Sequence, residues 1–159
     1  MAPSTTKKVF IRRFDREPVS GFITPQTYLQ PNGIEVLKQD GSILTLSYRE
    51  VKRVCFVRDF PEPGAEDDRK IFLTRPKMEG LWIRLLFRDG DLMEGIIPNN
   101  LLLIDPYGFA FVPPDPFSNN QRIFVPREAL REIHVLGVVG AKATKSRKAE
   151  VQGQAKLFE

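Results

Sequence analysis

The sequence predicts an all-β protein that consists of two tandem copies of one small unit. Short runs rich in β-branched and aromatic residues alternate with turn residues along most of the 159-residue chain, which is typical of strands. The segment VKRVCFV at Val51–Val57 resembles LREIHVL at Leu130–Leu136, and an Arg-Glu pair precedes both segments. Repetition of this kind indicates a duplicated structural unit.

The first expected unit covers residues 8–60. The Asp40-Gly41 pair lies between two apolar runs and predicts a tight hairpin turn. Ser47–Glu50 is expected to form a single helical turn before the last strand. The five expected strands are Val9–Phe14, Val19–Ile23, Ile34–Leu37, Ile43–Leu46 and Val51–Val57.

The second expected unit covers residues 81–137 and follows a linker at residues 61–80, in which Ile71–Leu73 is a candidate extra strand. Gly95 takes the place of Gly21, and an Asp89-Gly90 turn follows the first strand. Five strands with one helical turn before the last are typical of a small Sm-like or SH3-like barrel, and closure of such a sheet removes exposed edges. The expected strands are Leu81–Phe87, Leu92–Ile97, Gly108–Val112, Gln121–Val125 and Leu130–Leu136.

Alternation along each strand predicts which side chains face the core. The strand Val9–Phe14 is apolar on both faces, which usually means burial on both, so we expect it near a contact between the two units. In the last strand of each unit, the residues expected to face inward are Val54, Phe56, Ile133 and Val135, and those expected to face outward are Cys55 and His134.

Composition excludes several classes of protein. No apolar run approaches the roughly 20 residues that a membrane-spanning helix needs, and the first residues lack the apolar stretch of a secretory signal. A single cysteine cannot form an internal disulfide, which fits a reducing compartment. We therefore expect a cytoplasmic protein that is not inserted in a membrane.

The net charge of +4 is concentrated in residues 138–159, which are expected to form a flexible basic tail. Residues 1–140 hold 19 Lys and Arg against 18 Asp and Glu, whereas residues 141–159 hold five against two. A nearly neutral body argues against a wide phosphate-binding face and favours an ordinary solvated surface. The alternative is nucleic-acid binding, for which the candidate contacts are Arg12, Arg13, Lys52, Arg53, Lys145, Arg147 and Lys148.

No set of catalytic, cofactor-binding or metal-binding residues is expected. The only histidine, His134, corresponds to the only cysteine, Cys55, but equivalent positions in different units do not form a nucleophile–base pair. The sequence contains neither the Cys/His spacing of a zinc site nor a glycine-rich phosphate loop. It therefore predicts a protein that is not an enzyme and needs no cofactor.

The densest polar cluster lies in the loop between the expected strands Gly108–Val112 and Gln121–Val125. Asp, Pro, Ser and Asn all stabilise turns, so one interpretation is a wide hairpin turn. The other is a ligand-contacting loop in which Phe117 offers a stacking face. The candidate site residues are Asp115, Phe117, Ser118, Asn119, Asn120 and Arg122.

The end of the chain resembles the short sliding-clamp-binding peptide of bacterial replication and repair proteins, whose pattern is Gln-x-x-Leu-Phe. Gln154, Leu157 and Phe158 match the pattern, while Ala155 and Lys156 differ from the residues usual between them. The resemblance implies that the two apolar side chains enter a pocket of a protein partner while the glutamine hydrogen-bonds at its rim. The alternative is a flexible tail with incidental apolar residues.

The segments LWIRLLFRDGDLMEG, from Leu81, and VFIRRFDREPVSGF, from Val9, together with DPFSNN and FVRDF, resemble an uncharacterised bacterial family of duplicated small Sm-like barrels. The resemblance covers residues 8–137, and members of that family are sometimes attached to PilZ-type signalling domains. It implies a fold but no activity. It does not imply cyclic-dinucleotide binding, because the chain lacks the PilZ motif of paired arginines followed by an Asn/Asp-x-Ser-x-x-Gly element.

These observations favour a non-enzymatic adaptor that presents a two-barrel body and the C-terminal peptide to a protein partner, with the DNA sliding clamp as one candidate. The alternative is binding of RNA or single-stranded nucleic acid through the barrels and the basic tail. The oligomeric state stays open, because small barrels of this type often form rings, whereas a fused pair can satisfy its own edges.

Overall fold

The computed structural model describes residues 6–62, 69–115, 117 and 119–140. Within these residues the only helices are two short 3-10 helices, η2 (Leu101–Leu103) and η3 (Arg127–Ala129), so the all-β prediction is confirmed. Most expected strands are present with bounds close to those predicted. The strands are β1 (Lys7–Arg13), β2 (Val19–Ile23), β3 (Leu29–Gln30), β4 (Gly33–Lys38), β5 (Ile43–Leu46), β6 (Val51–Val57), β7 (Gly80–Phe87), β8 (Leu92–Ile97), β9 (Gly108–Phe111), β10 (Asn120–Pro126) and β11 (Leu130–Val139).

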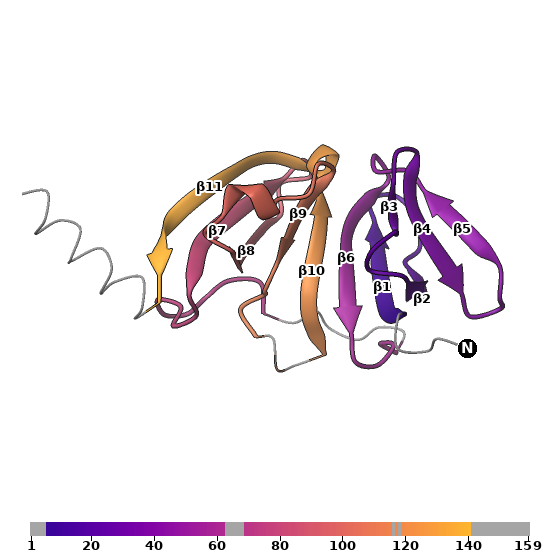
Figure 1. Cartoon of the computed structure of the whole chain (residues 1–159), viewed down its shortest axis with the longest axis horizontal. Helices are drawn as coiled ribbons and strands as arrows, with labels where there is room; N and C mark the ends of the chain where they lie inside the picture. The colour runs from indigo at the N-terminus through magenta and orange to yellow at the C-terminus, as the bar shows by residue number, and fades with distance from the viewer. Residues whose placement is uncertain (1–5, 63–68, 116, 118, 141–159) are drawn as a thin grey trace, which may run out of the picture.

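The strands form two sheets (Figure 1). An eight-stranded sheet has the order β3-β4-β2-β1-β6-β10-β9, with β5 paired to β4, and a three-stranded sheet has the order β11-β7-β8. Neither sheet closes into a barrel within the described residues. The expected pair of separate closed barrels is therefore not what the strand pairing forms, because β6 pairs with β10 and not with β5.

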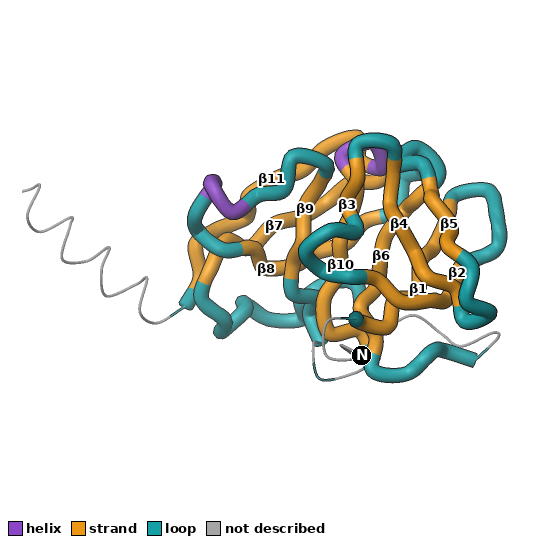
Figure 2. The backbone as a smooth tube through the Cα atoms, turned by 45° about the vertical axis from the view of Figure 1, so that its right-hand side comes forward, coloured by secondary structure: helices purple, strands orange, loops and turns teal. Residues whose placement is uncertain are grey.

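Strand β10 joins regions that the sequence assigns to different units. It pairs antiparallel with β6, so that Val54 lies opposite Phe124 and Cys55 lies opposite Ile123. Its other edge pairs with β9. One run of backbone hydrogen bonds therefore extends from the first expected unit into the second, and Figure 2 shows β10 beside β6 in the middle of the molecule.

The strand pairings of the first expected unit recur in the second. Val9 lies opposite Gly21 in the pair β1–β2, and Ile83 lies opposite Gly95 in the pair β7–β8. Three other pairings also have a counterpart at the aligned positions, whereas the pairing of β3 with β4 has none among the described strands. The matching pairs are Phe22–Leu37 with Ile96–Val112, Ile11–Val54 with Leu85–Ile133, and Ile34–Leu46 with Phe109–Val125.

Gly21 and Gly95 allow close approach at the same place in the two units. A Cβ atom at Gly21 would lie 2.6 Å from the carbonyl oxygen of Leu37, and one at Gly95 would overlap the ring of Phe111. Any larger residue would displace the neighbouring strand or ring, so both positions require glycine.

The buried apolar side chains form two clusters, one made mainly by residues of β1–β6 and one made mainly by residues of β7–β11. Strand β1 packs against both. Val9 and Ile11 belong to the first cluster, whereas Phe10 and Phe14, the residue directly after the strand, pack against the second. The prediction that this strand is packed on both faces, near the contact between the units, is confirmed.

The last strands alternate as predicted, but the burial expected from this alternation is partly wrong. Val54 is fully buried as expected, but its counterpart Ile133 and also Val135 are exposed. Cys55 faces away from the first cluster as expected, and it is buried in the second cluster. The reason is that β6 is paired along both edges, whereas β11 pairs only with β7 among the described strands.

The end of the linker docks on β8 through a buried carboxylate. Glu94 accepts a hydrogen bond at 3.0 Å from the indole nitrogen of Trp82 and another at 3.0 Å from Nη2 of Arg84. The backbone nitrogen of Phe72 donates to the same carboxylate at 3.3 Å. Ile71–Leu73 therefore lies against the sheet but is not the extra strand that the sequence suggested. The short strand β3 and the helix η2 were not predicted.

Candidate binding surfaces

A groove of about 620 Å³ lies beside the junction of β6 and β10. Its walls combine aromatic and aliphatic side chains with a few charged ends, and its volume is in the usual range of ligand sites in proteins. The apolar lining residues are Pro25, Tyr28, Leu29, Phe56, Leu103, Pro106, Tyr107 and Ala110.

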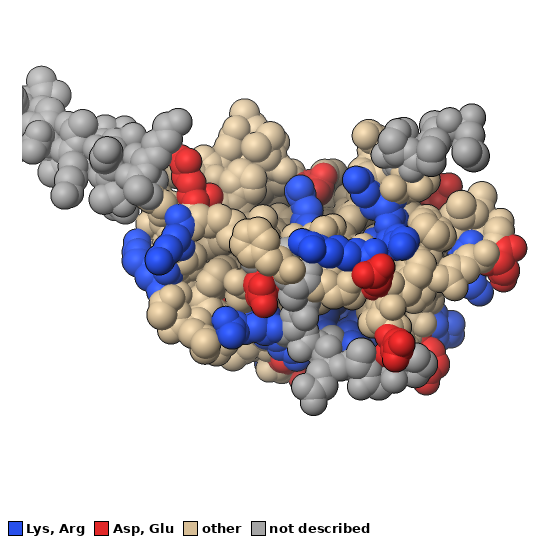
Figure 3. All heavy atoms as spheres, turned by 90° about the horizontal axis from the view of Figure 1, so that it is seen from below, with Lys and Arg blue, Asp and Glu red and all other residues tan. Residues whose placement is uncertain are grey.

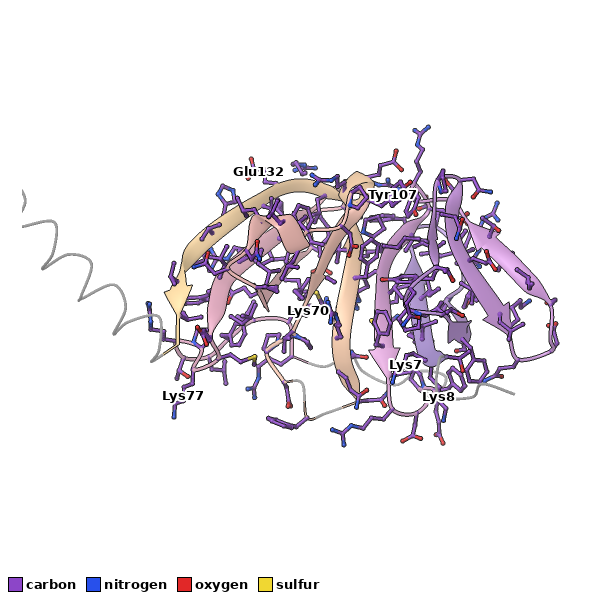
Figure 4. The ribbon with its side chains drawn as sticks, viewed as in Figure 1. Lys7, Lys8, Lys70, Lys77, Tyr107 and Glu132 are labelled. Carbon is purple, nitrogen blue, oxygen red and sulfur yellow. The ribbon has the colours of Figure 1, made fainter. Side chains whose placement is uncertain are left out.

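Aromatic contacts hold the wall of this groove in place. Tyr28 packs edge-on against Phe56 and Phe124, with ring centroids 5.9 Å apart in each pair. Tyr107 stacks on Tyr48 with centroids 4.9 Å apart and ring planes at 8°. Figure 4 shows Tyr107 at one end of the junction between the two regions. Rings held in this way present a preorganised apolar surface.

The tyrosines that support the groove stay neutral at physiological pH. Burial, with a smaller contribution from Asp105, raises the pKa of Tyr28 far above its ordinary value. Burial and the neighbouring Tyr107 raise the pKa of Tyr48 to about 12, and its hydroxyl donates to the carbonyl oxygen of Gln30 at 2.6 Å. These phenols therefore act as hydrogen-bonding groups and packing surfaces, not as general bases.

Three successive leucines extend the apolar surface at the rim of the groove. Leu101–Leu103 form η2, and Oδ1 of Asn100 caps this helix by accepting from the backbone nitrogen of Leu102 at 3.1 Å. Leu102 is 93% exposed, and Leu103 is 63% exposed and lines the groove. Exposed leucines beside an apolar groove are typical of an interaction surface. The sequence analysis missed them, although an apolar triplet within a turn region was a usable signal.

A second pocket, of about 230 Å³, gathers the basic strand residues that the sequence suggested as nucleic-acid contacts. Arg12 of β1 lies opposite Arg53 of β6, so antiparallel pairing brings cations from two distant segments together. All four predicted strand cations line this basic pocket, which is formed by Arg12, Arg13, Lys52 and Arg53 together with Arg16 and Lys70.

Two carboxylates neutralise part of this charge. The Nζ of Lys52 lies 2.8 Å from Asp89 and 3.0 Å from Asp91, and the Nζ of Lys70 lies 3.0 Å from Asp91. Burial opposes the ionisation of Asp91, but hydrogen bonds from the two lysines outweigh it and lower the pKa of this carboxyl to about 2. This network fastens β6 to the Asp89-Gly90 turn, so part of the basic pocket has a structural role. On the face in Figure 3, acidic side chains likewise lie among the basic ones.

A comparison with known protein families matches the region of the chain that contains both pockets. The model of one protein family matches residues 5–137, which contain the groove, the leucine run and the basic pocket. The chain belongs to the DUF6982 family. This is a family of unknown function, and its match ends before the expected tail at residues 138–159. No curated protein and no solved structure matches the chain.

Within the DUF6982 region, the polar loop is tied to the end of β6. Asn119 receives a hydrogen bond from the backbone nitrogen of Asp59 at 3.0 Å and donates one to its carbonyl oxygen at 2.9 Å. Phe117 is 85% exposed, whereas Arg122 lines the groove. These contacts support the turn interpretation for Asn119, and of the described members of the predicted loop site only Arg122 lines the groove or the basic pocket.

Several predicted residues receive no structural test. Asp115 lies in the loop and Asn120 begins β10, and neither lines the groove or the basic pocket. The other untested residues lie outside the described part of the chain: Ser118, Lys145, Arg147, Lys148, Gln154, Leu157 and Phe158.

Cys55 and His134 do not meet. Cys55 is buried in β6 of the larger sheet, whereas His134 is exposed on β11 of the smaller sheet, with its Nε2 3.0 Å from the carboxylate of Glu132. Within the described ranges, no three His, Cys, Asp or Glu side chains cluster as metal ligands would. Among these residues, no helix combines the length and the apolar character needed to cross a membrane.

Proposed function

We propose that the chain is a non-enzymatic adaptor built from two copies of one five-stranded, Sm-like unit. The groove beside β6 and β10 binds an apolar segment of a protein partner, and the C-terminal tail offers a second contact, for which the DNA sliding clamp is the candidate. The observation that carries this proposal is the aromatic groove with an exposed leucine run at its rim.

The chemistry of the groove suits a peptide with one large apolar side chain. Tyr28, Phe56 and Tyr107 offer aromatic surfaces of the kind enriched at the centres of protein interfaces. Asp105 and Arg122 lie in the same lining and supply an acceptor and a donor for a peptide backbone. The partner segment therefore inserts an aliphatic or aromatic residue and is oriented by polar groups at the edge.

The proposal of two copies is supported by the strand registers. Residues that lie opposite each other in the first unit have equivalents that lie opposite each other in the second unit. Val9 lies opposite Gly21, for example, and Ile83 lies opposite Gly95. A shift of one residue would turn every side chain to the other face, so independent strands do not reach matching registers by chance in pair after pair.

A peptide-display selection against the full chain tests the groove. We expect enriched peptides to carry a large apolar residue. Leu103→Arg should weaken their binding about tenfold or more, because it places a hydrated charge at the rim. Leu73→Arg changes an exposed leucine outside the groove lining and is the matched control. Absence of enrichment, or equal losses in both variants, would remove the groove from the proposal.

A binding measurement with a purified bacterial sliding clamp tests the tail. The full chain should bind, and the Leu157→Ala/Phe158→Ala variant should lose binding because both apolar anchors are gone. The Lys145→Ala/Lys148→Ala variant keeps the anchors and removes charge, so it should still bind. Equal binding by the full chain and the variant without anchors would separate the tail from clamp binding.

Single-stranded nucleic-acid binding is the second candidate, because four cations from β1 and β6 meet in the basic pocket. It predicts that affinity for a short RNA falls steeply as salt concentration rises. Arg13→Ala/Arg16→Ala should weaken binding without breaking the ion pairs of Asp89 and Asp91, and Lys77→Ala serves as the control. Failure to bind RNA at low salt would remove this candidate.

A further inference from the structure

Strands β5 and β11 each have an edge with exposed apolar side chains. Among the described residues, β5 pairs with β4 alone and β11 pairs with β7 alone. Ile43 of β5 is 67% exposed, and Val135 of β11 is 61% exposed. The backbone groups along such an edge are able to pair with a further strand.

The chain already contains one pairing between two strands that correspond to β5 and β11 in the other unit. Strand β6 has the place in the first unit that β11 has in the second, since β6 pairs with β1 as β11 pairs with β7. Strand β10 has the place of β5, since β10 pairs with β9 as β5 pairs with β4. In the folded chain, β6 and β10 pair with each other. The corresponding pairing of β11 with β5 is not made within the chain.

The consequence of that difference is visible in burial. Val54 and Cys55 of β6 are buried, whereas the equivalent Ile133 and His134 of β11 are exposed. The two strands have similarly apolar centres, VCFV and IHVL. Strand β11 thus has the composition of a strand that is paired along both edges, although a described strand pairs with only one of them.

We propose that a second copy of this chain covers that edge: β5 of one copy pairs antiparallel with β11 of the next, as β10 pairs with β6 within the chain. Figure 1 shows β5 and β11 at opposite ends of the molecule, so one chain does not pair its own two edges. Because the contact joins two different surfaces, it is heterologous, and successive copies form a closed ring or an open filament.

The internal contact sets the register of the contact between copies. Within the chain, Phe56 lies opposite Arg122, Cys55 opposite Ile123 and Val54 opposite Phe124. The most exposed apolar residues of the two edges become cross-strand neighbours, which stabilises the pair. The expected opposite pairs between copies are Val135 with Ile43, His134 with Leu44, and Ile133 with Thr45.

Sedimentation velocity of the full chain, from low micromolar to about 1 mM, tests the association. The average mass should rise with concentration for the wild-type chain and for Leu102→Lys, which changes an exposed leucine outside both edges. Val135→Lys and Ile43→Lys each place a charge in the contact and should keep the mass at that of one chain. Both side chains are exposed, so these variants should fold, and circular dichroism checks that they do. A wild-type chain that stays monomeric at every concentration overturns the proposal.

Mixing the two edge variants gives the sharpest test. Ile43→Lys keeps an intact β11 and Val135→Lys keeps an intact β5, so an equimolar mixture contains one intact contact. It should form a one-to-one dimer and nothing larger, which a symmetric contact between identical edges would not do. A mixture that stays monomeric counts against the proposal. The groove variant Leu103→Arg should assemble like the wild-type chain, so this result does not depend on what the groove binds.

Disulfide cross-linking tests the register. Chains carrying Leu44→Cys, mixed with chains carrying His134→Cys, should give a reducible dimer on oxidation, because directly opposite residues are close enough for a disulfide. Thr45→Cys replaces Leu44→Cys as the control, since its side chain points to the other face of the strand. Equal cross-linking with both partners, or none with either, contradicts the proposed register.

Discussion

Strands β6 and β11 are equivalent in sequence and in their pairing to the first strand of each unit, yet their surroundings differ. Strand β6 is covered along both edges, by β1 and β10, and its centre is buried. Strand β11 has one described neighbour, β7, and its centre is exposed. The comparison teaches that the burial of a side chain depends on the neighbours of its strand as much as on the alternation within the strand.

The largest expected effect separates these two strands directly. Val54→Asn should lower the free energy of unfolding by about 3–4 kcal/mol, because it buries an amide with no prepared partner. Ile133→Asn, at the equivalent exposed position, should cost less than about 1 kcal/mol. Urea unfolding at low micromolar concentration, where association is minimal, measures both. Similar losses at the two positions would mean that the strands are equally covered.

The two equivalent glycines should respond differently to a suppressor. Gly95→Ala should cost about 2–3 kcal/mol, because its methyl group overlaps the ring of Phe111. Phe111→Leu removes the ring, so the double variant should lose less than the sum of the two single losses. The methyl group of Gly21→Ala would instead contact the backbone carbonyl oxygen of Leu37. Leu37→Ala leaves this backbone atom in place, so it should not reduce the loss of stability. Thermal unfolding of the single and double variants measures the coupling, and additive losses at Gly95 would contradict the overlap.

The link between the units through Asp91 should depend on pH. Its pKa is about 2 in the folded chain against an ordinary 3.8, so the ionised carboxylate stabilises the fold above about pH 4, and this contribution is lost as the pH falls toward 2. Asp91→Asn should therefore cost about 1–2 kcal/mol at pH 7 and progressively less below pH 4. Urea unfolding at pH 7 and pH 3 measures the difference. A loss that does not change with pH would show that the ion pairs are not its cause.

The smallest expected effect concerns the loop before β10. Asn119→Ala removes two hydrogen bonds to the backbone of Asp59 and should cost about 1 kcal/mol. Phe117→Ala, in the same loop but exposed, should stay within about 0.5 kcal/mol of the wild-type chain. Thermal unfolding of both variants provides the measurement. If Phe117→Ala were the more damaging, the loop would be held by its aromatic residue and not by Asn119.

Local pattern was enough to predict most strands and the correspondence of Gly21 with Gly95, because alternation and turn residues act over a few neighbouring positions. The Asp40-Gly41 and Asp89-Gly90 turns were found for the same reason, and both glycines have positive φ angles near 90°. The contact of Phe10 and Phe14 with the second cluster was also readable, because β1 is apolar on both faces.

Pairing between distant strands was not readable. Nothing in Val51–Val57 distinguishes a strand that is covered by β10 from one at an edge, so the exposure of Ile133 was mispredicted, whereas the orientation of Cys55 away from the first cluster was predicted correctly. The groove was missed for the same reason, since Tyr28, Phe56 and Tyr107 come from separate segments. The basic residues were identified, but the carboxylates that neutralise Lys52 flank Gly90 in a turn far away in the sequence.

The buried carboxylate of Glu94 has a practical consequence. It holds the indole of Trp82, the single tryptophan of the chain, beside Phe72, whose ring centroid lies 6.2 Å away. Release of this linker segment would replace Phe72 beside the indole by water, and the fluorescence emission of the indole would move to longer wavelength. The protein therefore carries its own optical reporter, which signals local opening of residues 70–73 before either sheet comes apart.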